Sequence, residues 1–391
     1  MSVHRIACTA MALMAAIAVH CQYFSSMRID RHDYADTIPI EIRRGRILVP
    51  VEVEGKKYKF VFDTGCSSGL LFTRDAISTK SKFGLLLISD AAGHTRLARR
   101  HRIPRMRIGS LTITNYPVTV TPASSVMNLE YDCVENVGCI GMDIVSKGRA
   151  VKIDAERKHL ILTDRRDHFA GETGFHWPMH IDQRVPYFRV NAGDVKSRWC
   201  MFDSGYNGFI NVRDKDLGTA VDTLAVGTGV TNGGIYGYQS EHRVYMLSLD
   251  SISVGDCVFR HVVTDVQRGN SFVLGALLLK YGSLVLDYGS KEAIYQPYKS
   301  EKGHVEVGNR YLDYGLMYRD SLMRVSIVWE GSKAWQKGLR AGYHLTHIDG
   351  KDVKYDPCAY MQMDTNVCHD LLFSGPDSVT VSIRREATSS F

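Results

Sequence analysis

Two six-residue segments decide the fold: Phe60–Gly65 has the sequence FVFDTG, and Cys200–Gly205 has the sequence CMFDSG. In each segment apolar residues lead to an aspartate, which is followed by a hydroxyl residue and a glycine. The apolar run predicts a strand, and Asp-Ser/Thr-Gly is typical of the turn that ends one. Asp63 and Asp203 are therefore expected at the same point of two similar units.

The residues around these segments recur in the same order. Val-Pro opens a predicted hairpin at 49–50 and again at 185–186. Downstream, an apolar residue and glycine at 140–141 return at 274–275, and VKID at 151–154 returns as LVLD at 284–287. One such triplet alone would suit a simple loop cap, but two in a repeated frame indicate an internal duplication.

Together these motifs resemble the aspartic proteases, in both their single-lobe retropepsin-like and two-lobe pepsin-like forms. The resemblance covers about 37–297. It implies an all-β fold with short helices, in which two duplicated β-barrel lobes at 36–166 and 167–298 enclose a cleft for an extended peptide. It also implies roles for six residues: Asp63 and Asp203 as the catalytic pair, Thr64 and Ser204 as buried hydroxyls that lock the turns, and Gly65 and Gly205 as turn glycines.

The chemistry of such a pair follows from electrostatics. Two carboxylates a hydrogen bond apart cannot both ionise cheaply, so they share one proton, as the dyad of aspartic proteases is known to do. The ionised member takes a proton from water as the water attacks a peptide carbonyl, and the protonated member stabilises the oxyanion. This mechanism needs no metal and no cofactor.

The residues after the two triplets depart from the pepsin-like pattern. A hydroxyl residue often stands there and favours the ionised form of a catalytic carboxylate, whereas this chain carries Cys66 and Tyr206. Because a thiol is a poor donor, we expect the pair to keep its proton to higher pH, with a mildly acidic to near-neutral optimum. Cys66 is predicted to be a buried small residue rather than a nucleophile, since no histidine lies near it in sequence.

Two glycine-containing segments are candidates for a flap over the substrate. The first contains Gly93 and His94, and the second contains Gly234 and Tyr236. Either can supply a mobile cover, and either can be an ordinary surface loop.

The C-terminal segment at 305–388 is predicted to be a separate unit after a polar linker at 299–303. It resembles a PDZ domain, with Tyr314, Gly315 and Leu316 as the loop that binds a peptide carboxylate. Lys333, Tyr343 and Asp349 depart from the family pattern and leave the ligand preference open. Such a domain binds a peptide as an added strand at a sheet edge.

Composition and charge restrict the function classes. The chain has 391 residues, of which 45% are hydrophobic, and a net charge of +6. This size suits two or three globular domains. The modest charge lacks interleaved aromatic residues, which argues against nucleic-acid binding.

The N-terminus predicts export. Residues 1–21 have a basic start and an apolar run at 6–19, which is short for a membrane span and typical of a signal peptide. A lipid anchor on Cys21 is disfavoured because the bulky His20 precedes it. The rest of the chain is predicted to contain no membrane span.

The cysteines suggest local disulfides in an oxidising compartment. Cys133 can pair with Cys139, and Cys358 with Cys368, while the other thiols are expected to be free and buried. No Cys-x-x-Cys pair or His/Cys cluster predicts a zinc site.

The sequence therefore predicts an exported aspartic endopeptidase with peptide or protein substrates and a PDZ-like unit for a peptide ligand. The first alternative is a catalytically inactive protein that keeps the fold for peptide binding or scaffolding. The second, a homodimer that uses Asp63 alone, is disfavoured because the second half repeats the whole unit.

Overall fold

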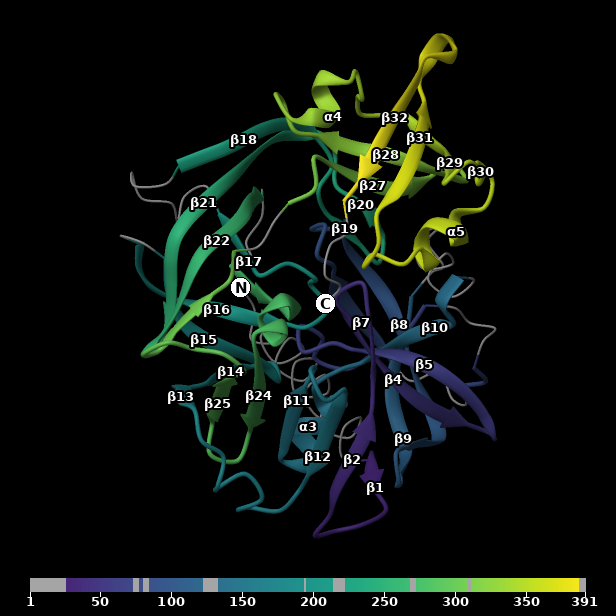
Figure 1. Cartoon of the computed structure of the whole chain (residues 1–391). Helices are drawn as coiled ribbons and strands as arrows, with labels where there is room; N and C mark the ends of the chain where they lie inside the picture. Colours follow the sequence, from purple (N-terminus) through teal and green to yellow (C-terminus); the bar gives the residue numbers. More distant parts are fainter. Residues whose placement is uncertain are drawn as a thin grey trace, which may run out of the picture.

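The computed structural model describes residues 26–72, 77–79, 84–121, 133–192, 195–213, 222–267, 272–308 and 311–386. The predicted signal peptide at 1–21 lies outside these ranges. The described chain is mostly β with short helices, which confirms the predicted fold class (Figure 1). None of its helices has the length and apolar character that a membrane crossing requires.

The first half forms a closed barrel of six strands. The alternation of side chains explains which residues face the interior of the barrel: in β4 Val49, Val51 and Val53 are buried, while Pro50 is exposed. The strands are β4 (Arg46–Val53), β5 (Lys56–Phe62), β6 (Gly69–Leu71), β8 (Thr95–Ile108), β9 (Leu111–Val120) and β10 (Asn136–Ile140). Around the barrel they pair in the order β5, β4, β8, β9, β6, β10 and back to β5.

The second half repeats this barrel. Its strands are β15 (Val185–Ala192), β16 (Val195–Asp203), β17 (Ile210–Arg213), β21 (His242–Val254), β22 (Cys257–Gln267) and β23 (Val273–Gly275). They pair in the order β16, β15, β21, β22, β17, β23 and back to β16, with the same parallel and antiparallel sense at every step. The duplication predicted from the sequence is therefore present in the strand pairing.

Both halves contribute to a third, shared sheet. Its order is β13 (Phe175–Pro178), β25 (Glu292–Pro297), β24 (Gly282–Asp287), β11 (Ala150–Asp154), β12 (His159–Thr163) and β2 (Ala35–Pro39). At its centre Lys152 lies opposite Val285 in an antiparallel pair. These residues occupy the same place in VKID and LVLD, so the pseudo-twofold axis between the halves passes between them.

Short elements complete the two halves. They are β1 (Arg28–Ile29), β3 (Glu41–Arg43), β7 (Leu85–Ser89), β14 (His180–Asp182), β18 (Asp222–Gly229), β19 (Gly233–Gly234), β20 (Gly237–Tyr238), α3 (Asp143–Gly148) and the 3-10 helix η2 (Ala276–Lys280). One buried apolar cluster runs through both barrels and the shared sheet.

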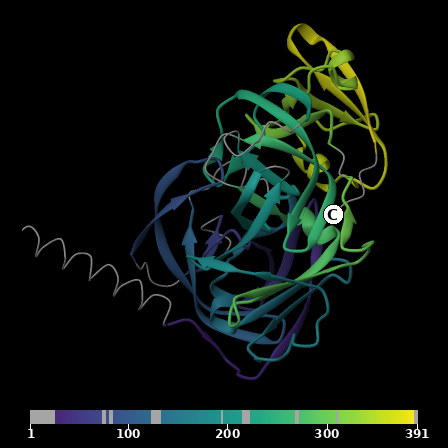
Figure 2. The same ribbon diagram turned by 90° about the vertical axis from the view of Figure 1, so that its left-hand side faces the viewer.

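The C-terminal unit has its own sheet and core. The sheet contains β27 (Tyr314–Arg319), β28 (Leu322–Val328), β29 (His344–Ile348), β30 (Lys351–Asp352), β31 (His369–Ser374) and β32 (Thr380–Arg385), accompanied by α4 (Lys333–Gln336), α5 (Pro357–Gln362) and the 3-10 helix η3 (Pro376–Ser378). Figure 1 shows this unit, in yellow-green to yellow, at one end of the molecule next to β18, and Figure 2 shows the same end in the turned view.

The strand β26 (His304–Glu306) changes the expected start of this unit. It pairs in parallel with β22, and Val305 and Val307 are buried in the core of the two halves. The second half therefore extends beyond residue 305, where the sequence placed the boundary.

The disulfide predictions for the local pairs were wrong. Cys133, just before β10, is bonded instead to Cys358 on α5, across 225 residues of chain. Cys139 lies buried within β10 and Cys368 is exposed, both as free thiols. Sequence proximity failed here because α5 packs against the first half, where Gln362 donates a hydrogen bond to the Cys133 carbonyl (2.8 Å).

Candidate active site

The two predicted aspartates meet at the ends of equivalent strands. Asp63 follows β5, and its N–H donates to the carbonyl of Ile140 at the end of β10 (3.0 Å). Asp203 ends β16 and lies beside Gly275 of β23. The two half-buried carboxyl groups are hydrogen-bonded to each other. The duplicated frame thus brings together residues that are 140 positions apart in the sequence.

Two buried hydroxyls lock the turns together, as the resemblance implied. The Thr64 N–H donates to Ser204 Oγ (2.9 Å) and the Ser204 N–H donates to Thr64 Oγ1 (2.8 Å). Each hydroxyl then donates across the axis, Thr64 to the Phe202 carbonyl (2.8 Å) and Ser204 to the Phe62 carbonyl (2.7 Å). Because every donor is satisfied in a fully buried place, this crossed network holds the aspartates rigidly.

The glycines allow the close approach. The N–H of Gly65 donates to Asp63 Oδ1 (2.9 Å), and that of Gly205 donates to Asp203 Oδ1 (2.8 Å). A Cβ on Gly65 would lie 2.5 Å from Asp203 Cγ, and one on Gly205 would lie 2.9 Å from Asp63 Cγ. Each turn therefore needs glycine because it faces the opposite carboxyl group.

Burial and mutual repulsion hold a proton on the pair. Burial first, and then the charge of Asp203, raise the pKa of Asp63 well above its usual range. Burial also raises the pKa of Asp203, and the Gly205 N–H partly offsets this. Arg46 on β4 acts in the opposite direction and lowers the pKa of Asp63. The site can thus present one carboxylic acid and one carboxylate to a single water.

The side chains of the residues after the triplets donate their hydrogen bonds to backbone carbonyls and not to the carboxyl groups. The Cys66 thiol donates to the Ser68 carbonyl (3.1 Å), and the Tyr206 hydroxyl donates to the Ile210 carbonyl (3.4 Å). Neither stands in for the hydroxyl donor of the pepsin-like pattern. The prediction of a mildly acidic to near-neutral optimum stays a prediction.

The two flap candidates contact each other. Asp90, at the turn between β7 and β8, accepts hydrogen bonds from the His94 N–H (2.8 Å) and from the Tyr236 N–H (2.9 Å). Its side chain is only 2% exposed. An added Cβ on Gly234 would lie 2.2 Å from Asp90 Oδ2, whereas Gly93 has open space around it. We call the contact of Asp90 with 234–236 the flap clasp.

Apolar residues connect the flap clasp to the turn that carries Asp63. Ile88 of β7 and Ile235 of the β19–β20 hairpin pack on a small cluster that also includes Cys66 and Cys139. Both flap candidates therefore pack on the same small cluster as Cys66, the residue that follows the first triplet. A cover over the aspartates would need such a position.

The predicted carboxylate loop lies in a different part of the molecule. Tyr314 is buried in the core of the C-terminal unit, and Leu316 packs against that core. Within the described chain β27 is an edge strand that pairs only with β28. The outward N–H of Tyr318 donates to the Tyr238 hydroxyl of the β19–β20 hairpin (3.0 Å). This edge strand thus touches the second flap candidate and not the aspartates.

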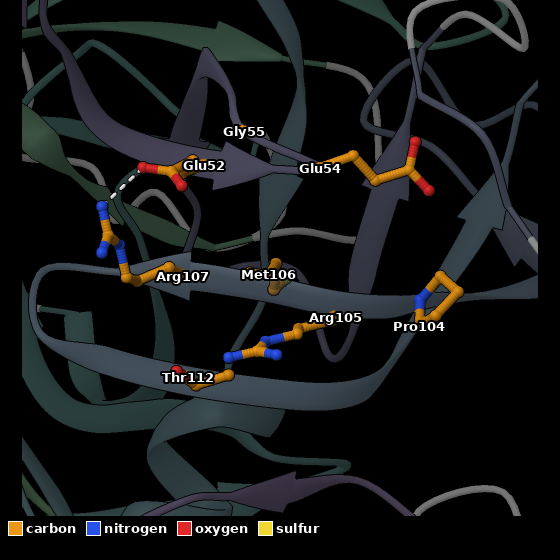
Figure 3. A pocket seen from close by; sticks show the side chains of 8 residues that line it. All are labelled: Glu52, Glu54, Gly55, Pro104, Arg105, Met106, Arg107 and Thr112. Atoms are coloured by element: carbon orange, nitrogen blue, oxygen red, sulfur yellow. Dashed lines mark hydrogen bonds and ion pairs between the residues drawn. The ribbon is translucent and has the colours of Figure 1, made fainter.

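A surface hollow in the first barrel does not belong to this site. It lies between the β4–β5 turn and the strands β8 and β9, where Arg107 and Glu52 form an ion pair (2.6 Å) (Figure 3). None of the eight residues that line it belongs to the dyad turns.

Three residues near the candidate site could not be identified from the sequence alone. No motif predicts that Arg46 lies near Asp63. Asp90 lies just before Gly93 in the first flap segment, yet its partner Tyr236 is 146 residues away. Cys139 was assigned to a disulfide, although it lies with Asp63 and Cys66 in a group whose ligand atoms are within 4.8 Å of one another. A Cys immediately before the apolar-Gly pair was the available signal for the last.

Comparison with known protein families finds a match within the first barrel. A family model described as an aspartyl protease matches residues 49–144, from β4 to the start of α3. No curated protein sequence matches the chain. Among solved structures, Basic 7S globulin from soybean is similar, with 10% identity, a TM-score of 0.43 and coverage of 71% of this chain and 99% of the globulin chain. The family match includes Asp63 but ends before Asp203. The equivalence of Asp203 to Asp63 is instead supported by the repeated strand pairing.

Proposed function

We propose that the chain is an exported aspartic endopeptidase whose catalytic pair is Asp63 and Asp203. The observation that carries the proposal is the crossed network of Thr64 and Ser204, which holds the two carboxyl groups within hydrogen-bonding distance of each other. The match of residues 49–144 to an aspartyl protease model supports the reaction class.

The reaction uses the pair as a unit. A water bound to both carboxyl groups loses a proton to the ionised one as it attacks the peptide carbonyl. The protonated carboxyl group donates to the oxyanion, and a proton then passes to the leaving nitrogen as the C–N bond breaks. Burial of the pair strengthens these interactions because less water screens them.

The catalytic test is replacement of either aspartate by asparagine. Asp63→Asn and Asp203→Asn should each reduce peptide cleavage by a factor on the order of 10⁴ or more, because an amide cannot take the proton of the water. Purified proteins are incubated with a diverse peptide library across pH, and products are identified by mass. Asp256→Asn, on the exposed turn between β21 and β22, is the matched control and should behave as wild type.

Two results would decide against the proposal. Cleavage that survives in either asparagine variant would exclude the shared-proton mechanism. The wild-type protein could also be folded and yet cleave no peptide and bind no statine-type transition-state mimic. That result would favour the alternative, a catalytically inactive peptide-binding protein.

Export and a PDZ-like role for the C-terminal unit are part of the proposal. The Cys133–Cys358 disulfide and the apolar run at 6–19 support an oxidising destination. The sheet edge at β27 suits an added peptide strand, which would compete with Tyr238 for the Tyr318 N–H. N-terminal sequencing of the mature protein tests the removal of residues 1–21. Titration of peptides into wild type and into Tyr238→Phe, with comparison of the two affinities, tests whether the β27 edge binds a peptide strand.

A further inference from the structure

We propose that Asp63, Cys66 and Cys139 form an inhibitory site for a thiophilic divalent cation such as Zn²⁺ or Cd²⁺. The ligand atoms of these residues, one carboxylate oxygen and two sulfurs, all lie within 4.8 Å of one another. Tetrahedral zinc with bonds of about 2.0–2.3 Å places its ligands roughly 3.5–3.8 Å apart. Small side-chain movements are therefore enough to close three ligands around one ion.

The fold holds the two sulfurs in place from separate elements. Cys66 follows the first catalytic turn, and its carbonyl accepts a hydrogen bond from the Met142 N–H (2.8 Å). Cys139 lies in the middle of β10, paired with Val61 of β5 on one side and Leu70 of β6 on the other. The two thiols are hydrogen-bonded to each other, and both are free of disulfides.

The surroundings suit a metal–thiolate site that opens to one side. Leu48, Val61, Leu70 and Phe72 form the apolar cluster around Cys139, and the flap residues Ile88 and Ile235 pack against it. Cys66 is only partly buried, whereas Cys139 is buried, so a cation would enter from the side of Cys66. Soft sulfur ligands favour Zn²⁺ and Cd²⁺ over Mg²⁺ or Ca²⁺, and a water can fill the fourth position.

The equivalent positions in the second half carry no thiols. Tyr206 stands at the position of Cys66, and Val273 stands at the position of Cys139. The pair of thiols is therefore no requirement of the barrel, which forms without them in the second half. This asymmetry also supplies a conservative variant, Cys139→Val, whose new side chain the equivalent strand already accommodates.

Binding has a direct consequence for the proposed peptidase, and this part rests on the proposed function. A cation on Asp63 removes the oxygen that would hold the attacking water. The ion displaces one proton from each thiol to solvent, so no oxidant or reductant is needed. Inhibition should therefore be reversed by a chelator.

The experiment titrates Cd²⁺ into the full-length protein kept free of oxygen and follows the ultraviolet charge-transfer band of Cd²⁺–thiolate bonds. Wild type should bind one equivalent with this band, and Cys139→Val and Cys66→Ala should each lose most of it. Cys368→Ser, which removes an exposed thiol elsewhere, should keep it. Asp63→Asn should keep the band but bind Cd²⁺ about tenfold or more weakly, because a ligand is worth at least as much as an outer-sphere partner.

Activity provides a second readout. The Cd²⁺ concentration for half inhibition should rise about tenfold or more in Cys139→Val, relative to that variant's own uninhibited rate. A wild-type protein without the band, or a band that persists in Cys139→Val, would overturn the site. A normal band in a protein that cleaves no peptide would refute the proposed function and leave the cation site standing.

Discussion

At the scale of single residues, Gly65 sets how closely the two turns approach. Its missing Cβ would lie 2.5 Å from Asp203 Cγ, a distance that side chains do not tolerate. We predict that Gly65→Ala reduces kcat/KM on the order of 100-fold, because a displacement of about 1 Å in a catalytic group has that effect. Gly171→Ala is the control, since an added Cβ there meets open space. Equal kcat/KM values for the two variants would contradict the close approach.

Asp143 predicts how stability depends on pH. This carboxyl group lies fully buried at the start of α3, where it accepts a hydrogen bond from the Tyr116 hydroxyl (3.1 Å) and another from the Ile144 N–H (2.9 Å). Burial raises its pKa to about 7, although Tyr116 and Arg184 oppose the shift.

The sign of the effect follows from proton binding. Between the ordinary pKa near 4 and about 7 the folded state binds a proton that the unfolded state has lost, so the free energy of unfolding falls as pH rises. The slope from Asp143 is at most about 1.4 kcal/mol per pH unit. We expect Asp143→Asn to flatten the curve of unfolding free energy against pH between 4 and 7, measured by denaturant titration. An unchanged slope would assign the pH dependence to other groups.

At the scale of elements, the flap clasp joins the β7–β8 hairpin to the β19–β20 hairpin. Asp90→Ala leaves the N–H groups of His94 and Tyr236 without their acceptor, at a cost of about 1–3 kcal/mol each if they stay buried. We predict faster amide exchange at 88–94 and 232–238 and a KM raised several-fold, with kcat changed less. Asp256→Ala on an exposed turn should change neither. Exchange that stays slow in Asp90→Ala would show that other contacts hold the hairpins.

Sequence patterns located these hairpins but not their contact. Glycines mark turns locally, and both flap segments were found this way. The hydrogen bond between Asp90 and Tyr236 depends on where two barrels place their loops, which no local pattern encodes. The same holds for Arg46, whose position near Asp63 comes from the register of β4 against β5.

At the scale of the whole molecule, one disulfide fastens the C-terminal unit to the first half. The bond between Cys133 and Cys358 closes 225 residues of chain, and loop entropy predicts about 5 kcal/mol of stabilisation for a loop of this length. Cys358→Ser should lower the thermal transition temperature of the C-terminal unit and make the unit more sensitive to limited proteolysis. Wild type reduced with dithiothreitol should show the same two changes. Cys368→Ser should match wild type. A transition temperature indifferent to dithiothreitol would mean that packing alone holds the unit.

The order of the units was predictable, and their connections were not. Repeated motifs identify the duplicated barrels because equivalent residues build equivalent turns, as Asp63 and Asp203 do. The contacts between the second half and the C-terminal unit follow no motif: the Val230 N–H, just after β18, donates to the Ser326 carbonyl (2.9 Å), and Arg243 of β21 pairs with Glu330 (2.7 Å). Such interfaces depend on complementary surfaces that are encoded far apart in the chain.

The axis through Lys152 and Val285 bears on how such a chain can arise. Two identical subunits meeting there would set each side chain against its own copy, so Lys152 would oppose another ammonium group and Val285 another isopropyl group. Covalent fusion removes that constraint and lets the two positions diverge. Lys152 instead forms an ion pair with Glu172 (2.7 Å), in the segment that leads into the second half. Because of Lys152, the first half suits pairing with the second half better than pairing with a second copy of itself.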